Sequence, residues 1–189
     1  MKTAGILLAA GASRRFGPDD KLLAILRGKP LVTHAAAALS GFAPDFLIGV
    51  VRSPEVANVL DGFDIVYPDE ADPGQADSLR AGVLAAQSMQ ADRILVVLGD
   101  MPLISVELLK EVAMRCRLDR PSAATDGKRP SPPACFPRAF FPDLLKISGD
   151  RGAAGLLGAL PEDALISAPE KVLFDVDNEE RLLKLNKSS

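Results

Sequence analysis

The feature of the sequence that most constrains its fold is an alternation of short apolar runs with segments of helical spacing. The apolar runs are continuous and bounded by polar or turn residues, which is typical of strands buried on both faces. They predict strands at 3–9, 45–52, 63–68 and 92–100. The intervening segments predict helices at 31–40, 53–60, 77–90 and 105–118, with Ser53 and Ser105 as N-caps and Gly41 ending the first. This alternation predicts an α/β chain with a mostly parallel, Rossmann-like sheet in a three-layer α/β/α arrangement.

The second half of the chain is less regular. The segment 119–137 carries five prolines and contains a short strand pattern at 133–136. A loop of this length is uncommon within a compact domain, so we expect a hairpin or a lid over a site. A turn leading into a helix is expected at 149–160, and a strand followed by a helix at 171–187. The 189 residues are expected to form one domain.

Composition excludes several classes of function. A formal net charge of −3 argues against a protein that binds duplex nucleic acid. The two cysteines, Cys116 and Cys135, lack metal-ligand spacing and suggest reduced thiols in a cytoplasmic protein. The single histidine, His34, lies in a helical pattern and suggests a packing or surface role, which leaves little material for a Ser-His-Asp triad. The N-terminal apolar run is too short to cross a membrane and has no signal-peptide pattern, so we expect no membrane partner. From the net charge we expect no nucleic-acid partner either.

A cationic, glycine-containing loop follows the first predicted strand. Gly11 and Gly17 allow backbone N–H groups to point into a concavity that suits an anion. Arg15 and Lys21 add full charges where a polyphosphate would lie. The spacing matches neither the Walker A loop nor the GxGxxG fingerprint. A solvated basic loop without a ligand is the alternative interpretation.

An acidic residue follows the most apolar strand pattern. Asp100 ends the run "RILVVLGD" and would lie at the carboxyl edge of the sheet, where open α/β sheets bind ligands. A carboxylate there suits Mg²⁺, which takes one or two carboxylates together with substrate phosphates. Taken alone, Gly99-Asp100 is better explained as a simple turn. A neighbouring cationic loop favours a metal-bound polyphosphate site.

The stretch "LAAGASRRFGPDDK" resembles the signature loop of nucleotidyltransferases, and more narrowly that of the molybdenum cofactor cytidylyltransferase and guanylyltransferase group. Four further stretches agree in order: "GQADSLRAGV" at 74–83, "LGDMP" at 98–102, "SGDRGAAGLL" at 148–157 and "DVDNEE" at 175–180. The resemblance implies a fold of the nucleotide-diphospho-sugar transferase type. It also implies that about residues 1–102 bind the nucleotide and about 103–189 bind the acceptor.

The resemblance assigns roles to individual residues. Those implied to bind the nucleotide are Leu8, Ala9, Ala10, Gly11, Ser13, Arg15, Lys21, Gly74, Ser78 and Asp100. Of these, Arg15, Lys21 and Asp100 are the implied catalytic residues. Asp100 and Asp177, with Asp175 as the alternative to Asp177, are the implied Mg²⁺ ligands. The turn containing Gly149, Asp150 and Gly152 is implied to face the acceptor.

The implied reaction transfers a nucleoside monophosphate, CMP from CTP, to the phosphate of molybdopterin and releases pyrophosphate. The segments "LAAG" followed by Ser and "GQ…SL" are more similar to the cytidylyl branch. The alternatives are a guanylyltransferase, a nucleotidyltransferase for another small phosphomonoester, and a non-catalytic nucleotide- or cofactor-binding accessory protein. A monomer or weak homo-oligomer in transient contact with a molybdoenzyme is expected.

Two positions depart from the family pattern. Ser131-Pro132-Pro133 lacks the usual glycine before the 133–136 strand. Asn178-Glu179 replaces the usual Thr-Pro after Asp-Val-Asp, and Asn can also cap a helix.

Overall fold

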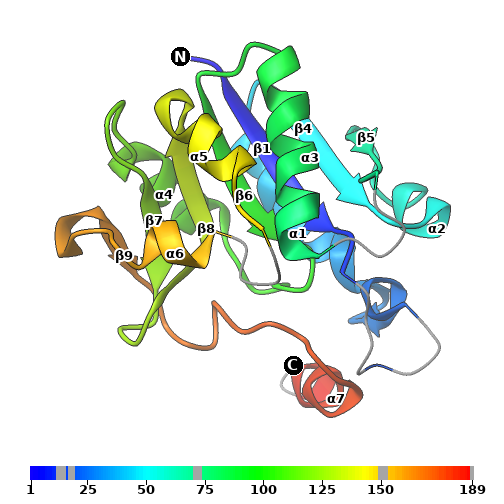
Figure 1. Ribbon diagram of the computed structural model, residues 1–189. Coiled ribbons are helices and arrows are strands. Elements are labelled where there is room, and N and C mark those ends of the chain that lie inside the picture. Colours follow the sequence, from blue (N-terminus) through cyan, green and yellow to red (C-terminus); the bar gives the residue numbers. More distant parts are fainter. Residues whose placement is uncertain (12–15, 17–19, 70–73, 149–152, 188–189) are drawn as a thin grey trace.

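The core of the fold is a seven-stranded sheet, seen in a computed structural model that describes residues 1–11, 16, 20–69, 74–148 and 153–187 (Figure 1). The strand order is β5-β4-β1-β6-β8-β7-β9. The strands are β1 (Thr3–Ala9), β4 (Phe46–Val51), β5 (Asp64–Val66), β6 (Arg93–Leu98), β7 (Ser122–Thr125), β8 (Pro130–Pro137) and β9 (Leu165–Ser167). All neighbouring pairs are parallel except those of β8, which runs antiparallel to β6 and to β7. The predicted mostly parallel α/β sheet is therefore confirmed.

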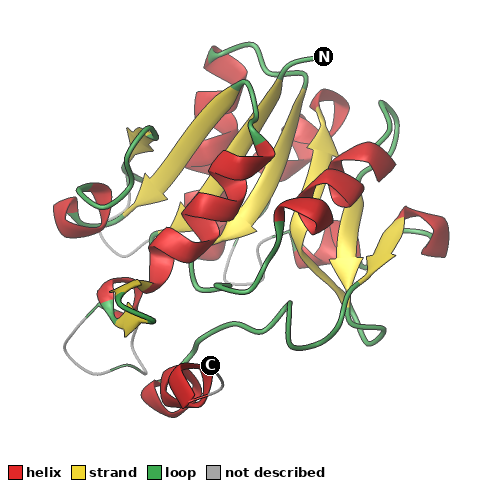
Figure 2. Ribbon diagram, turned by 180° about the vertical axis from the view of Figure 1, so that it is seen from behind, coloured by secondary structure: helices red, strands yellow, loops and turns green. Residues whose placement is uncertain are grey.

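Helices cover both faces of this sheet, which explains why its central strands are continuously apolar. One face packs against α1 (Leu31–Phe42) and α4 (Val106–Arg115). The other packs against α3 (Gln75–Ser88), α5 (Phe141–Leu145) and α6 (Ala154–Leu157). In Figure 1, α3 lies in front of the sheet and α1 behind it; Figure 2 shows the reverse side. The three-layer arrangement is thus the one predicted.

Shorter elements complete the chain. They are the 3₁₀ helices η1 (Lys21–Leu23), η2 (Arg138–Phe140) and η3 (Glu162–Ala164), the β2 (Ile25–Leu26)–β3 (Lys29–Pro30) hairpin, α2 (Pro54–Ala57) and α7 (Glu179–Lys187). The predicted caps are confirmed, because the hydroxyl groups of Ser53 and Ser105 accept from the backbone N–H groups of Val56 and Leu108. His34, for which a packing or surface role is expected, is half-buried on α1, with Nε2 2.9 Å from the carbonyl oxygen of Leu26.

The proline-rich segment 119–137 forms a β-hairpin, β7–β8, as expected. It is built into the sheet, with β8 between β6 and β7.

Two expectations about predicted elements are wrong. Helix α1 does not end at Gly41 but continues to Phe42. A Cβ at Gly41 would lie 2.9 Å from Cγ2 of Val106, so this glycine permits the close approach of α4.

The strand predicted at the start of 171–187 does not form. The segment between β9 and α7 has no regular structure and passes beneath the carboxyl ends of the strands (Figure 1). Its apolar residues are used in packing, because Val176 is fully buried in a third apolar cluster with Phe16, Leu26, Leu31 and Leu182. This cluster anchors the segment below the sheet. Among the described residues, no helix combines the length and apolarity needed to cross a membrane.

Candidate functional site

The carboxyl ends of β1 and β6 lie side by side and form the floor of the site. Leu8 pairs with Leu98, and the N–H of Gly99 donates to the carbonyl oxygen of Leu8 at 2.9 Å. A Cβ at Gly99 would lie only 3.1 Å from Cγ2 of Val32 and 3.3 Å from the Leu8 carbonyl oxygen. Glycine therefore allows β6 to end tightly against β1. Asp100, the next residue, is held at the edge of the sheet where the sequence predicts it.

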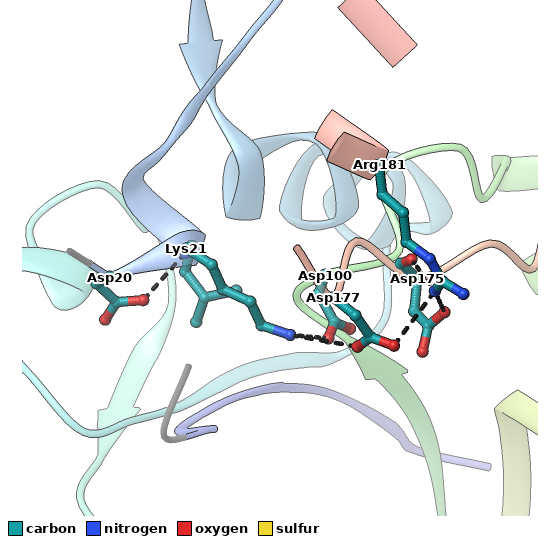
Figure 3. Close-up of polar contacts among 7 residues, drawn as sticks. Asp20, Lys21, Asp100, Asp175, Asp177 and Arg181 are labelled. Carbon is teal, nitrogen blue, oxygen red and sulfur yellow. Dashed lines mark hydrogen bonds and ion pairs between the residues drawn. The ribbon is translucent and has the colours of Figure 1, made fainter. Parts of the chain in front are cut away.

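Lys21 reaches the same point from the loop after β1. It is the first residue of η1, whose N-cap Asp20 accepts from the N–H of Leu22 at 3.0 Å. Leu22 is buried in the core against α1 and α2. Because this side chain anchors the short helix, the neighbouring lysine is directed toward the end of β6 (Figure 3).

The ammonium group of Lys21 lies between two carboxylates. Nζ is 2.6 Å from Oδ2 of Asp100 and 3.9 Å from Oδ1 of Asp177. The side chains of Lys21, Asp100 and Asp177 are 12%, 18% and 33% exposed. Three segments that are far apart in the sequence thus meet in one group of ion-paired side chains (Figure 3).

Asp177 is positioned by the segment that crosses below the sheet. The N–H of Val176 donates to the carbonyl oxygen of Asp100 at 2.9 Å, which ties this segment directly to the end of β6. Helix α7 begins immediately afterwards. Its first turn is capped by Asn178, whose Oδ1 accepts from the N–H of Arg181 at 2.9 Å. The Asn at the position of the usual Thr therefore caps the helix, as the sequence indicates.

Arg181 contacts the carboxylates on the other side of the site. Its Nη1 lies 2.8 Å from Oδ1 of Asp175 and 3.2 Å from Oδ2 of Asp177. Its guanidinium carbon lies 4.8 Å from the centre of the Phe174 ring. Within the described chain, the cluster of Asp100, Asp175, Asp177, Lys21 and Arg181 has three negative and two positive charges, which leaves one negative charge.

Asp100 is a largely buried carboxylate with a perturbed pKa. Burial raises the pKa of its carboxyl group above the ordinary value, while the ammonium of Lys21 opposes this by lowering it. Its Oδ1 is buried and has no hydrogen-bond partner among the described residues. A buried carboxylate oxygen without a partner is costly unless a donor or a cation satisfies it.

The donor set fits Mg²⁺ bound together with a substrate. No cluster of three or more Asp, Glu, His or Cys side chains suited to a metal occurs among the described residues. Two carboxylates, Asp100 and Asp177, already face one cation. Mg²⁺ usually takes one or two protein carboxylates, with waters and substrate phosphates as its other ligands.

A cavity of about 580 Å³ opens beside this cluster. It extends from the end of β1 and the start of α3 to β8, α6 and the segment before α7. Leu8, Val96 and Phe136 supply apolar lining, whereas Asp175 and Arg181 form its boundary toward the acidic cluster. The cavity is thus shared between the two halves of the chain.

The structure places the other predicted site residues as follows. Leu8 lines the cavity, Ala9 and Ala10 are buried, and a Cβ at Gly11 would meet no atom of the described residues within 4 Å. Gly74 is the N-cap of α3, and the hydroxyl of Ser78 donates to its carbonyl oxygen at 3.2 Å. Ser78 is buried and is not among the residues lining the cavity. Ser13, Arg15, Gly149, Asp150 and Gly152 lie outside the described residues.

Sequence reasoning did not single out most of the residues that line the cavity, among them Gln75, Arg129 and Arg181. Gln75 lies within the quoted stretch "GQADSL", beside the two residues that were chosen. Arg181 follows Asp177 by four residues, a spacing that brings opposite charges together on a helix. For Arg129 the sequence offers no comparable signal.

Comparison with known proteins gives relatives that match most of the chain. The purine catabolism protein PucB of Bacillus subtilis is 30% identical over 190 residues, which cover 93% of this chain and 92% of PucB. A molybdenum cofactor guanylyltransferase of Shewanella woodyi is 28% identical, over 78% of this chain and 74% of that protein.

Solved structures are similar over the whole chain. The crystal structure of Rv0371c from Mycobacterium tuberculosis matches with a TM-score of 0.85 and 26% identity, covering 100% of both chains. The complex of Rv0371c with manganese matches with a TM-score of 0.82 and 25% identity, again over 100% of both chains.

The family model of the MobA-like NTP transferase domain matches residues 5–164, which is most of the chain. The match includes β6, whose carboxyl end is followed by Asp100, and the whole sheet except for the first two residues of β1 and the strand β9. The chain belongs to the MobA-like NTP transferase family and is a nucleotidyltransferase with the fold of the nucleotide-diphospho-sugar transferases.

Proposed function

We propose that this protein transfers CMP from CTP to the phosphate of molybdopterin, with Mg²⁺, and releases pyrophosphate. The observation that carries the proposal is the meeting of Lys21, Asp100 and Asp177 at the carboxyl ends of β1 and β6. Opposite charges converge there at the edge of the sheet where α/β folds bind ligands. A triphosphate and a divalent cation would each find groups of opposite charge at this point.

Lys21 would bind the triphosphate and offset the negative charge that develops on the leaving pyrophosphate. To do so its ammonium must exchange Asp100 for phosphate oxygens. Asp100 and Asp177 would hold Mg²⁺, which supplies charge neutralisation and orientation of the phosphates when bound. Asp177 is favoured over Asp175 because it faces Lys21, whereas the described contacts of Asp175 are to Arg181. Arg15 remains our proposal for a second triphosphate ligand.

No general base is required for this reaction. The attacking phosphate oxygen of the acceptor is already an anion near neutral pH, so the protein has to align two anions and reduce their repulsion. The only histidine, His34, lies on α1 with its Nε2 beside a backbone carbonyl, which supports a mechanism without histidine catalysis.

The acceptor would occupy the cavity between α3, β8 and α6. Apolar lining suits a planar ring system, and the adjoining acidic cluster marks where the phosphate groups would meet. Ala153 and Ala154, which follow the turn that contains Gly149, Asp150 and Gly152, line this cavity. Their position supports the proposal that this turn faces the acceptor, and with it the division of the chain near residues 102 and 103.

GTP is the second candidate nucleotide. The guanylyltransferase of Shewanella woodyi, one of the relatives, supports it, whereas the segments "LAAG" and "GQ…SL" support CTP. An accessory protein that binds the nucleotide without turnover is the candidate from another class. A cytoplasmic location, a monomeric or weakly associating chain and a transient contact with a molybdoenzyme complete the proposal.

Pyrophosphate release from each of the four nucleoside triphosphates, with molybdopterin as acceptor and Mg²⁺ varied, tests the proposal. We expect CTP to give the highest kcat/KM and Asp100→Ala to remove most of the activity with little loss of CTP binding, because the carboxylate acts mainly in the transition state. A preference for GTP would identify the guanylyl alternative. CTP binding without turnover would identify the accessory protein. Full activity of Asp100→Ala would refute the assigned role.

A further inference from the structure

Arg181 is the cation that neither the family resemblance nor the proposed chemistry uses, although it touches the acidic cluster directly. We propose that Arg181 is a positioning residue, which holds Asp177 so that one oxygen of its carboxylate stays free for the divalent cation. This inference rests on the proposed function, because it concerns the metal ligand assigned there. It adds a residue that acts on the metal only through another side chain.

The two oxygens of Asp177 have different partners. Oδ2 lies 3.2 Å from Nη1 of Arg181, on the side of α7. Oδ1 lies 3.9 Å from Nζ of Lys21, on the side of Asp100 (Figure 3). An interaction at Oδ2 restricts rotation of the carboxylate and keeps Oδ1 directed toward Asp100. Hydrogen bonds of this kind to ligating carboxylates orient metal ligands in proteins.

Arg181 is itself held in place from several directions. Its Nη1 lies 2.9 Å from the carbonyl oxygen and 2.8 Å from Oδ1 of Asp175. The guanidinium group packs over the ring of Phe174. Its backbone N–H is bound by the Asn178 cap. A side chain fixed at backbone, ring and carboxylate can position Asp177, whereas a mobile surface arginine could not.

A purely electrostatic role makes the opposite prediction. If Arg181 only balances the charge of the cluster, its removal leaves a more negative site, and a divalent cation should bind more tightly. If Arg181 positions Asp177, its removal releases the carboxylate and the cation should bind more weakly. The sign of the change in metal affinity therefore separates the two roles.

The test measures Mn²⁺ binding by electron paramagnetic resonance and calorimetry, on full-length protein with a non-hydrolysable CTP analogue and without turnover. We expect Arg181→Met to weaken Mn²⁺ binding by about 10-fold or more. Arg181→Lys keeps the charge but not the planar group that packs over the Phe174 ring, so we expect an intermediate loss. Lys184→Met is the matched control. It removes one cation from the same helix, and its 2.9 Å pair with Glu180 is exposed.

The outcomes distinguish this inference from the proposed function. Weaker binding in Arg181→Met with unchanged binding in Lys184→Met supports the positioning role. Equal or tighter binding in Arg181→Met, with normal binding by the unaltered protein, overturns the inference and leaves the proposed function intact. Absence of Mn²⁺ binding by the unaltered protein overturns the proposed metal site and the inference together. If Arg181→Met fails to fold, unchanged binding by Arg181→Lys overturns the inference.

Discussion

Replacing Lys21 by methionine tests whether the ion pair at the end of β6 is as tight as the geometry indicates. The substitution removes the ammonium but keeps a long apolar side chain, and it leaves the carboxylate of Asp100 buried without its cation. Breaking a buried pair by removing one partner costs about 3–5 kcal/mol. Because the two side chains retain 12% and 18% exposure, we expect the lower end, a loss of about 3 kcal/mol in the free energy of unfolding.

The loss should depend on pH in a defined direction. Burial already raises the pKa of Asp100, and without the lowering effect of Lys21 that pKa rises further. An acid whose folded-state pKa is raised destabilises the fold when it is ionised. The deficit of Lys21→Met is therefore fully present above the raised pKa of the variant, shrinks as the pH falls through that pKa, and vanishes once Asp100 is protonated in both folded proteins.

Urea unfolding in the presence of a chelator measures this effect. The control is Lys146→Met, whose 3.4 Å pair with Asp143 is exposed and should contribute less than about 1 kcal/mol. Mn²⁺ should stabilise Lys21→Met more than the unaltered protein, because the metal no longer competes with the ammonium for Asp100. An unfolding free energy of Lys21→Met equal to that of the unaltered protein at neutral pH would refute the reasoning.

Three further substitutions have distinct expected outcomes. In Gly11→Val the new Cβ has no atom of the described residues within 4 Å, so we expect the melting temperature not to change while KM for the nucleotide rises; an unchanged KM would argue against nucleotide contact there. In Gly82→Ala the Cβ would lie 2.8 Å from Cγ2 of Ile6, and urea unfolding should show a loss of about 1–3 kcal/mol, reduced by the better helix propensity of alanine. A gain in stability would contradict that packing. Ser122→Ala removes a 2.6 Å hydrogen bond to the carbonyl of Val112 and should destabilise the protein by about 1–3 kcal/mol in the same assay, whereas wild-type stability would show that this carbonyl finds another donor.

The parts of the fold that could be predicted are those with a strong local signal. Strands β1, β4 and β6 are covered on both faces, so their sequences are continuously apolar. Strand β9 could not be predicted, because three residues at the edge of a sheet show too little periodicity. The strand predicted in the segment before α7 is wrong for a different reason. Its apolar residues Val172, Leu173 and Phe174 fill gaps beneath the sheet instead of pairing with a strand.

The candidate site, like the fold, has some residues that could be predicted from the sequence and others that could not. Lys21 and Asp100 could be chosen from the sequence because the carboxyl ends of neighbouring parallel strands meet at one edge. The contact of Asp177 with them depends on a crossing segment that is fixed by the burial of Val176 and by one backbone hydrogen bond to Asp100. The choice between Asp175 and Asp177 likewise depends on Arg181, whose contacts are tertiary.

The most direct test of the central claim is a crystal structure with Mn²⁺ and a non-hydrolysable CTP analogue, using the anomalous signal of manganese. We predict an anomalous peak between Asp100 and Asp177, with Nζ of Lys21 moved from Asp100 to the phosphate oxygens. A manganese peak elsewhere, with the 2.6 Å contact between Lys21 and Asp100 intact and the phosphates bound away from it, would contradict the account.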